Sequence, residues 1–293
     1  MSGFKRSAAS GGTGEKVHAL RASGTFVNPR SFLIVGLVII SLIVLVSVIG
    51  IFWTPYSPTE MKYGRFQAPS LAHPFGTDNF GRDIFSRVVK GTGTTLFIAL
   101  STVAIGSIFG IILGAITGYL GGWIDEVLMR VTDALTAFPS FLLALLIVSL
   151  IGPSGKYSVI IALGIVFIPS FARITRSEYA SLRNRNFVIG ARLMGASKFR
   201  IMFVYLLPNT KQVLLPALTI GFNNAVLAEA SMSFLGIGVT PPDASLGYML
   251  SEAQSMLALA PWYALSTGLT IVLLVFGVGL FSEGLQATVK GVD

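Results

Sequence analysis

The sequence contains no cysteine and only two histidines, His18 and His73. A chain without cysteine cannot form a disulfide, a thiolate metal site or a cysteine nucleophile. Two histidines also argue against a histidine-based metal site, because such sites draw several ligands from one cluster. We therefore expect no metal site, no catalytic residue and no bound cofactor in this chain.

Charged residues are scarce as well. Only 12% of the residues are Asp, Glu, Lys or Arg and 53% are hydrophobic, whereas a soluble domain has about 25% charged residues. The net charge of +8 comes from basic residues that lie mostly in expected loops and tails. No basic face is interleaved with exposed aromatic residues, as a nucleic-acid site would require. The composition predicts an all-α, polytopic membrane protein with no nucleic-acid partner.

The chain divides into six apolar stretches, each of about the length that crosses a bilayer. We expect transmembrane helices at residues 31–53, 94–120, 125–151, 158–175, 212–235 and 263–284. Basic residues gather in the N-terminal tail and in the loop 176–210, which predicts that both are cytoplasmic. The expected layout is a cytoplasmic tail (1–30), a first transmembrane helix (31–53), an external loop segment (54–92), a five-helix core (93–286) and a cytoplasmic tail (287–293).

Glycine recurs at every fourth position in the second expected span. The four residues are Gly106, Gly110, Gly114 and Gly118. In a helix this spacing puts all four on one face, and small residues let another helix approach closely in lipid. We expect this face to pack against a helix of this chain or of another.

A few polar residues and one proline lie within expected spans. Arg130 and Asp133 are three residues apart and could pair near the inner end of the third span, and Pro139 should bend that span. Glu229 lies toward the outer end of the fifth span. An acid within a span is a functional candidate, but near the outer end a structural role is favoured. These four residues are structural or gating candidates.

The loop 176–210 is the long polar interruption of the hydrophobic second half. Residues 188–199 are expected to form a short helix with small side chains, which let another protein approach its backbone. Ala191, Gly195 and Leu207-Pro208 resemble the Ala, Gly and Leu-Pro of the "EAA…G…LP" loop of ABC-transporter permeases. Ile189 departs from that pattern, because the family has Glu there.

Two further strings carry the same resemblance. HPFGTDNFGRDIFSR, residues 73–87, and SMSFLGIGVTPP, residues 231–242, resemble signatures of the C-type permease subunit of dipeptide, oligopeptide and nickel importers. From the residues alone, Asp78 could cap the helix that follows, and Asp78, Arg82, Asp83 and Arg87 could form ion pairs at helical spacing. This string is either a structural cap over the spans or a contact for a docking receptor protein.

The resemblance implies a type I ABC importer (MetI-like) permease fold with six transmembrane helices. It also implies a bacterial inner (plasma) membrane location with both termini cytoplasmic. The implied partners are the lipid bilayer, a second (B-type) permease subunit, an external substrate-binding protein and two nucleotide-binding ATPases that hold ATP and Mg. The implied ATPase-coupling residues are Gly190, Ala191, Arg192, Gly195, Ala196, Ser197 and Pro208.

The implied function is import of di- or oligopeptides, but importers of nickel, glutathione and oligosaccharides share these motifs. A channel or receptor subunit is the alternative from another class. An intramembrane enzyme is disfavoured because the chain has no H-E-x-x-H motif and no paired intramembrane aspartates. No window fits the phosphate-binding loop G-x-x-x-x-G-K-[ST], so any ATPase activity is expected in partner subunits.

Overall fold

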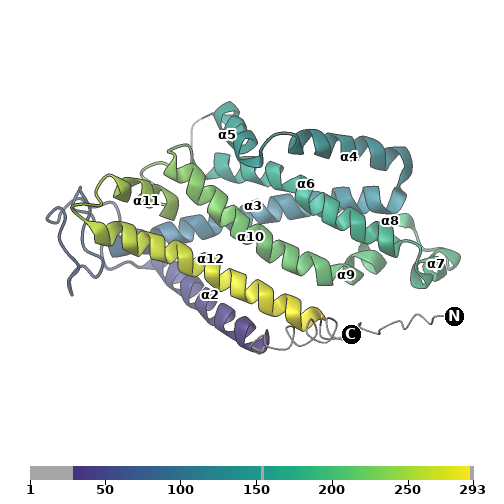
Figure 1. The fold of residues 1–293 in the computed structure, drawn as a ribbon, viewed down its shortest axis with the longest axis horizontal. Helices are drawn as coiled ribbons and strands as arrows, with labels where there is room; N and C mark the ends of the chain where they lie inside the picture. Colours follow the sequence, from purple (N-terminus) through teal and green to yellow (C-terminus); the bar gives the residue numbers. More distant parts are fainter. Residues whose placement is uncertain (1–28, 153–154, 291–293) are drawn as a thin grey trace, which may run out of the picture.

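A computed structural model of the chain describes residues 29–152 and 155–290 (Figure 1). The expected N-terminal tail, apart from its last two residues, lies outside them. The described residues form helices, a non-helical segment at 53–83 and one isolated β-bridge between Thr77 and Asp83. The helices are α2 (Pro29–Phe52), α3 (Ile84–Leu120), α4 (Gly122–Thr136), α5 (Ser140–Ile151), α6 (Lys156–Leu182), α7 (Asn186–Leu193), α8 (Lys198–Arg200), the π-helical turn η1 (Ile201–Leu206), α9 (Leu207–Asn209), α10 (Lys211–Phe234), α11 (Leu246–Gln254) and α12 (Pro261–Lys290).

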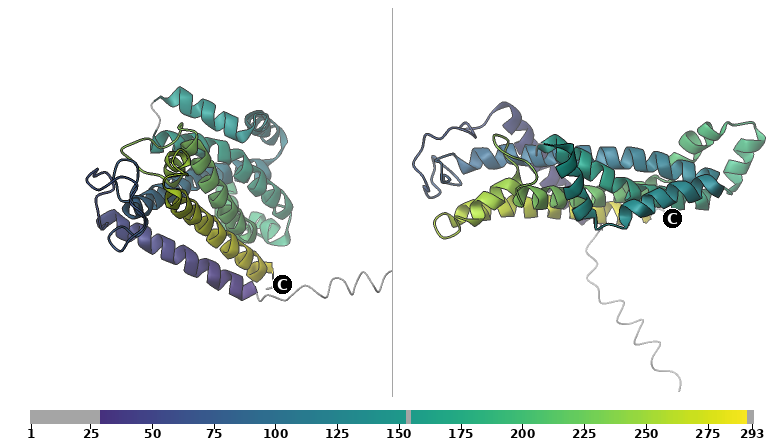
Figure 2. Two further views of the ribbon diagram at one scale, coloured as in Figure 1. Left: turned by 60° about the vertical axis from the view of Figure 1, so that its left-hand side comes forward. Right: turned by 90° about the horizontal axis from the view of Figure 1, so that it is seen from above.

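The central pair of the fold is α3 and α6, which lie side by side over most of their length (Figures 1 and 2). All four glycines of the expected face lie against α6. A Cβ atom added to Gly114 would lie 2.6 Å from the Cβ of Thr175 and 2.9 Å from the backbone nitrogen of Arg176. A Cβ on Gly118 would lie 2.6 Å from the carbonyl oxygen of Arg176. The two backbones therefore touch directly, which only glycine permits.

A second glycine seam joins α2 to α12. A Cβ on Gly36 would lie 2.8 Å from the carbonyl oxygen of Gly277, and a Cβ on Gly284 would lie 2.7 Å from the Cα of Leu33. This seam was not expected from the sequence, although the seven-residue spacing of Gly277 and Gly284 puts both on one helix face. Figures 1 and 2 show α2 lying along α12, while α10 packs between α3 and α12.

Helix α3 begins at Ile84, ten residues before the expected start of the second span at 94. Its N-cap is Asp83, whose Oδ2 accepts a hydrogen bond from the backbone N–H of Ser86 at 2.7 Å. The expectation that Asp78 caps this helix is wrong. The Asp78 carboxylate instead accepts bonds from backbone N–H groups of its own loop and from the side chains of Arg82 and Arg87, and it accepts none from a backbone N–H of α3.

The expected third span, 125–151, is not one helix. It consists of α4 and α5, which are bent by 88° at the break that contains Pro139. Proline has no N–H to donate and forces the preceding residue out of the helical region, so it breaks this element rather than kinking it. Within residues 29–152 and 155–290, five helices are long and apolar enough to cross a membrane, and the expected six are reached only if the bent pair counts as one span.

The loop between the fourth and fifth spans is also shorter and more ordered than expected. Helix α6 continues to Leu182, so Arg173 and Arg176 lie on a helix. The expected short helix at 188–199 is instead α7, which ends at Leu193, followed by a turn at Gly195 with φ +79°. A glycine in this left-handed conformation ends the helix, and a new helix begins at Lys198. Likewise α12 runs on to Lys290, through part of the expected tail at 287–293.

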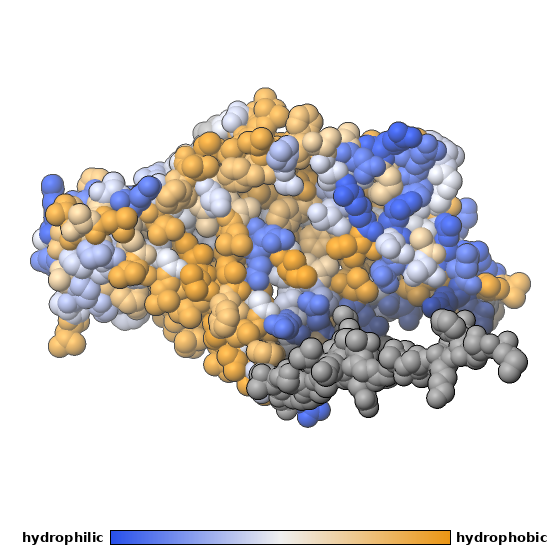
Figure 3. All heavy atoms as spheres, viewed as in Figure 1, coloured by the Kyte–Doolittle hydropathy of each residue, from blue (hydrophilic) through white to orange (hydrophobic). Residues whose placement is uncertain are grey.

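The surface has the pattern of a membrane protein. Figure 3 shows an apolar band around the middle of the molecule and hydrophilic residues at the end that carries α7. The band includes exposed apolar side chains of α2, α3 and α12, among them Val38, Leu100 and Leu269, each about 60% exposed. Exposed apolar surface of this extent is stable only against lipid or a partner protein. We call the two ends of the molecule the α7 end and the α11 end.

Candidate functional site

The α7 end is built around Tyr179, which is fully buried near the end of α6. Its hydroxyl donates a 2.9 Å hydrogen bond to the carbonyl oxygen of Met202 in η1. Val188 and Ala191 of α7 and Ile201 of η1 are buried in the same apolar cluster, together with Ala115 of α3. Helix α7 is therefore packed firmly onto the spans rather than held as a free loop.

Ion pairs and hydrogen bonds fix α6 to its neighbours at this end. Arg176 donates two bonds to Asp125 at the start of α4, Nε to Oδ1 at 2.5 Å and a terminal nitrogen to Oδ2 at 2.7 Å. Arg183 donates a 3.3 Å bond to the carbonyl oxygen of Gly118, near the end of α3. These bonds join α6 to α3 and α4 at the end of the molecule where α7 packs.

The expected coupling residues divide into exposed and buried ones. Gly190 and Gly195 have no atom within 4 Å of an added Cβ, so both face open space. Ala191 is 1% exposed and packs inward. The expectation that it forms part of a docking surface is therefore wrong, because its methyl group fills the apolar cluster beneath α7. Arg192 and Ser197 are exposed, as is Pro208, which follows η1, whereas Ala196 is half-buried.

The most exposed apolar groups at this end were not expected from the sequence. Leu193 is 84% exposed and Met194 is 80% exposed, at the end of α7 and the turn that follows it. Phe199 of α8 is 68% exposed. Leu193 and Met194 are neighbours in the chain, and adjacent apolar side chains that are this exposed are candidates for a protein contact. The available signal was the apolar Leu193-Met194 pair that directly precedes the turn glycine Gly195.

The ion pair expected between Arg130 and Asp133 does not form. Arg130 binds Glu126 at 3.4 Å, one turn earlier on the exposed face of α4. Asp133 binds Arg173 of α6 at 3.3 Å, and Arg173 also donates a hydrogen bond to Thr136. Asp133 and Arg173 therefore hold α4 against α6, directly before the break at Pro139.

Glu229 is fully buried between α10, α3 and the stretch that leads into α11. Its Oε2 accepts a 3.0 Å bond from the hydroxyl of Thr95, and its Oε1 accepts a 2.7 Å bond from the hydroxyl of Ser233. Those hydroxyls in turn accept from the backbone N–H groups of Leu246 and Val239. The carboxylate therefore connects three segments through two short hydrogen-bond chains.

Replacing Glu229 by Gln should destabilise the fold modestly. Each of the two hydroxyls already accepts a backbone N–H and donates its own hydrogen to one carboxylate oxygen. Glutamine replaces one of these oxygens by NH₂, which cannot accept, so one hydroxyl hydrogen is left without an acceptor. We expect a loss of about 1–2 kcal/mol in the free energy of unfolding, measured by denaturant titration in detergent. The control is Glu283→Gln on α12, where the side chain is exposed. Equal stability of the two variants would contradict this role.

Buried ion pairs connect the segment 53–83 to the helices at the α11 end. Asp78 Oδ2 accepts from Arg82 at 2.6 Å and from Arg87 at 2.5 Å. Glu252 of α11 accepts from the same two arginines at 3.0 and 2.7 Å, and from the hydroxyl of Tyr263 of α12 at 2.8 Å. Two acids and two arginines make the cluster neutral. We call Asp78, Arg82, Arg87, Glu252 and Tyr263 the charge cluster.

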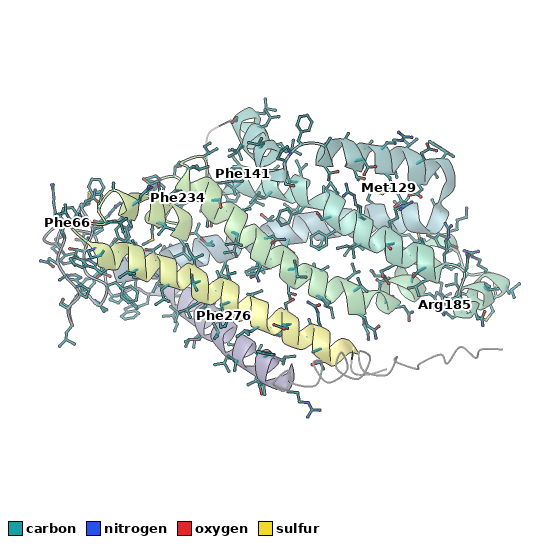
Figure 4. All side chains as sticks on the ribbon, in the orientation of Figure 1. Phe66, Met129, Phe141, Arg185, Phe234 and Phe276 are labelled. Carbon is teal, nitrogen blue, oxygen red and sulfur yellow. The ribbon has the colours of Figure 1, made fainter. Side chains whose placement is uncertain are left out.

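Residues next to the charge cluster also make close contacts. Burial raises the pKa of Tyr248 on α11, and the nearby Glu252 carboxylate raises it further. His73 Nδ1 lies 2.8 Å from Asp83 Oδ1, and the imidazole ring packs against both Tyr56 and Tyr63, which also contact each other. The arrangement holds a folded cap over the ends of the helices. Figure 4 places Phe66 of this cap at the opposite end of the molecule from Arg185.

The comparisons with known proteins agree with this architecture. Residues 110–290 match the family model described as "Binding-protein-dependent transport system inner membrane component". The chain belongs to this family. It is 41% identical to the dipeptide transport system permease protein DppC of Alkalihalophilus pseudofirmus, over 86% of this chain and 83% of that protein. It is 37% identical to the glutathione transport system permease protein GsiD of Pectobacterium atrosepticum, over 84% and 83% of the two chains.

A solved structure shows the same fold. One chain of an inward-facing MetNI methionine ABC transporter aligns with a TM-score of 0.58 at 19% identity, covering 71% of this chain and 96% of that chain. The type I importer (MetI-like) permease fold and the expected family are thereby confirmed. The chain is a multi-pass membrane protein of the transport permease class. Within the described residues, no group of three or more His, Cys, Asp or Glu could hold a metal ion.

Proposed function

We propose that this chain is one of two permease subunits of an ATP-driven importer of di- or oligopeptides in a bacterial inner membrane. The observation that carries the proposal is the 41% identity to a dipeptide permease over 86% of the chain. The α7 end then lies in the cytoplasm, as its basic residues favour. The other partners are a B-type permease, two ATPases and an external substrate-binding protein.

The side of the molecule between α6 and α10 supports a role in the translocation path. An open groove of about 330 Å³ lies between them, with mostly apolar walls that include Phe167 and Phe171. Ser170 and Asn224 add two exposed polar side chains to the same groove. A mostly apolar lining with few polar groups binds varied side chains weakly, which suits a substrate that must leave again. We propose that this groove faces the partner permease and forms half of the path.

The test is ATP-dependent uptake into proteoliposomes that contain the complex and its binding protein. Labelled dipeptide, labelled tripeptide, glutathione and nickel are offered in parallel. The proposal expects uptake of peptides and only weak uptake of nickel. Selective uptake of glutathione would support the relative GsiD as the better guide to the substrate. Flux without ATP would instead indicate a channel subunit.

Coupling to the ATPase is proposed to run through Leu193 and Met194 together with Gly190, Gly195 and Ala196. A ligand-dependent change requires that ATP binds the two conformations of the complex with different affinity, and α7 is packed so that its movement reaches α3 and α6. The two exposed apolar side chains would fill a groove of the ATPase, while the small residues allow a close approach.

Leu193→Asp should prevent ATPase binding while the permease remains folded, because Leu193 is 84% exposed in this chain. Burying an unpaired carboxylate in an apolar contact costs several kcal/mol, so we expect binding to weaken by at least about a hundredfold. Co-purification with the ATPase measures this. Asn186→Asp, which adds the same charge at the exposed start of α7, is the control. Unchanged co-purification of Leu193→Asp would exclude this docking surface.

A further inference from the structure

A groove of about 630 Å³ lies between α2 and α3 within the apolar band of the molecule. The two helices meet at the end nearest the segment 53–83, where a Cβ added to Gly50 would lie 3.5 Å from the Cβ of Val89. From there α2 follows α12 instead of α3 (Figure 1). Side chains of α10 and α12, among them Phe222 and Leu274, also line the groove. The lining is almost entirely apolar.

The groove lies at the depth of the hydrocarbon layer. It follows α3 from Gly93 to Ser107, about 21 Å at 1.5 Å per residue, inside a membrane-spanning helix. Half of the hydrocarbon layer is about 15 Å thick, so this length accommodates one extended acyl chain. Trp53, 65% exposed, directly follows α2, and Tyr157, 64% exposed, is the second residue of α6. Exposed aromatic residues at the ends of spans mark the boundary between hydrocarbon and water.

A second hollow, of about 350 Å³, adjoins the groove at this boundary. Ile51 and Phe97 are exposed and line both, so the two hollows open on the same side. The second hollow is also lined by Lys90 and Lys156. Lys156 pairs with Asp243 at 2.9 Å, whereas the exposed Lys90 has no ion-pair partner within the described residues. The mouth of the groove therefore carries one uncompensated positive charge.

Ser47 of α2 lies where the two hollows meet. It lines both and is 4% exposed, and its hydroxyl has no hydrogen-bond partner among the described residues. A buried hydroxyl without a partner is unfavourable unless a bound molecule supplies one. A phospholipid has an ester carbonyl between its phosphate and its acyl chain, and this carbonyl is such an acceptor.

The groove opens away from the side that we propose faces the partner permease. Ile220 and Asn224 of α10 line the groove between α6 and α10, whereas Leu218 and Phe222 line the groove beside α2. At about 100° per residue, the two pairs lie on nearly opposite sides of α10. Lipid rather than the partner subunit then borders the groove beside α2, and this step rests on the proposed function.

We propose that this groove binds one anionic phospholipid of the outer leaflet. Its acyl chain lies between α2 and α3, its phosphate contacts Lys90, and an ester carbonyl accepts a hydrogen bond from Ser47. An apolar cleft with a few polar groups at its mouth is the usual form of a site that holds an amphipathic ligand in one orientation. The bound lipid fills the wedge that α2 leaves where it turns from α3 to α12.

Lipid retention by the full-length chain, purified in mild detergent with the subunits that co-purify, tests the assignment. Native mass spectrometry counts bound phosphatidylglycerol after exchange into micelles of phosphatidylglycerol and phosphatidylcholine. Ala104→Phe puts a ring into the groove from an exposed position of α3 and should lose the lipid, whereas Val272→Phe adds a ring at an exposed position of α12 outside the groove and should keep it. Lys90→Gln should bind phosphatidylglycerol about fivefold more weakly. Lys211→Gln, at an exposed lysine outside both hollows, should bind it like wild type.

Loss of lipid in Ala104→Phe but not in Val272→Phe, with equal unfolding midpoints, supports the site. Leu100→Trp, from a second exposed position in the groove, repeats the test if Ala104→Phe lowers the midpoint. Equal retention by groove and control variants overturns the site, and wild-type retention in Lys90→Gln overturns the phosphate contact. Release of the partner permease instead of lipid would assign the groove to a helix of that subunit, and equally overturns the proposal. Retention needs no ATP, so a failure of ATP-driven peptide uptake by the wild type would count against the proposed function alone.

Discussion

Arg87→Met is expected to destabilise the chain by about 3–5 kcal/mol, the usual cost of removing one partner of a buried ion pair. Arg87 is 3% exposed and binds both Asp78 and Glu252, so its removal leaves the buried carboxylate of Asp78 and the mostly buried one of Glu252 with Arg82 as their remaining basic partner. The measurement is the midpoint of thermal or denaturant unfolding of the purified chain in detergent. Uptake should fall with the amount of folded complex.

The matched control is Lys62→Met, which breaks an exposed ion pair with Glu60 at 3.8 Å. Exposed pairs contribute about 0–1 kcal/mol, so this variant should be near neutral. Removing Arg87 and Glu252 together should cost less than the sum of the two single changes, because the neutral pair of Asp78 and Arg82 remains. Additive losses, or equal midpoints for Arg87→Met and Lys62→Met, would show that the charge cluster carries no such energy.

Gly114→Ala is the second change with a large expected effect. The new methyl group would lie 2.6 Å from the Cβ of Thr175 and 2.9 Å from the backbone nitrogen of Arg176. Backbone atoms cannot rotate away, so α3 and α6 must separate along their contact. Overpacking of this kind typically costs about 1–3 kcal/mol, and more where backbone is in the way. We expect a lower unfolding midpoint and poor recovery of the intact complex.

The same substitution at Gly190 should act in the opposite direction. Nothing lies within 4 Å of a Cβ at this helical position, and alanine is favoured over glycine in a helix by roughly 0.5–1 kcal/mol. Gly190→Ala should therefore leave the unfolding midpoint unchanged or raise it slightly. If both alanine variants unfold alike, contact between α3 and α6 does not depend on the glycine face.

Periodic and long features were predictable from the sequence. The span-length apolar stretches and the four glycines at i, i+4 spacing each lie in one continuous segment, so their geometry follows from the local sequence. The family motifs identified the fold. The seam of Gly36, Gly277 and Gly284 was missed because half of it lies in the first span and half in the last. No local pattern tells which of two distant helices will meet.

The errors at the candidate site share a physical cause. Ala191 and Leu193 are both apolar residues of one short helix, and only the packing of Tyr179 and Met202 beneath it decides which one is buried. Asp133 has two arginines within reach of its helix, and the path of α6 selects Arg173. Likewise Pro139 predicts a bend, but its size of 88° depends on how α4 lies on α6.

Helix α3 has 37 residues, which corresponds to a rod about 55 Å long, well beyond the roughly 30 Å of hydrocarbon that a span must cross. It contains no proline and carries Arg87 in its first turn and Tyr119 next to its last residue. Such a rod tilts as one lever. A tilt of about 10° around its middle would swing each tip by about 5 Å in opposite directions. A displacement of the end of α3 beside α7 would therefore displace its other end in the opposite direction, at Arg87 and the cap bonded to it.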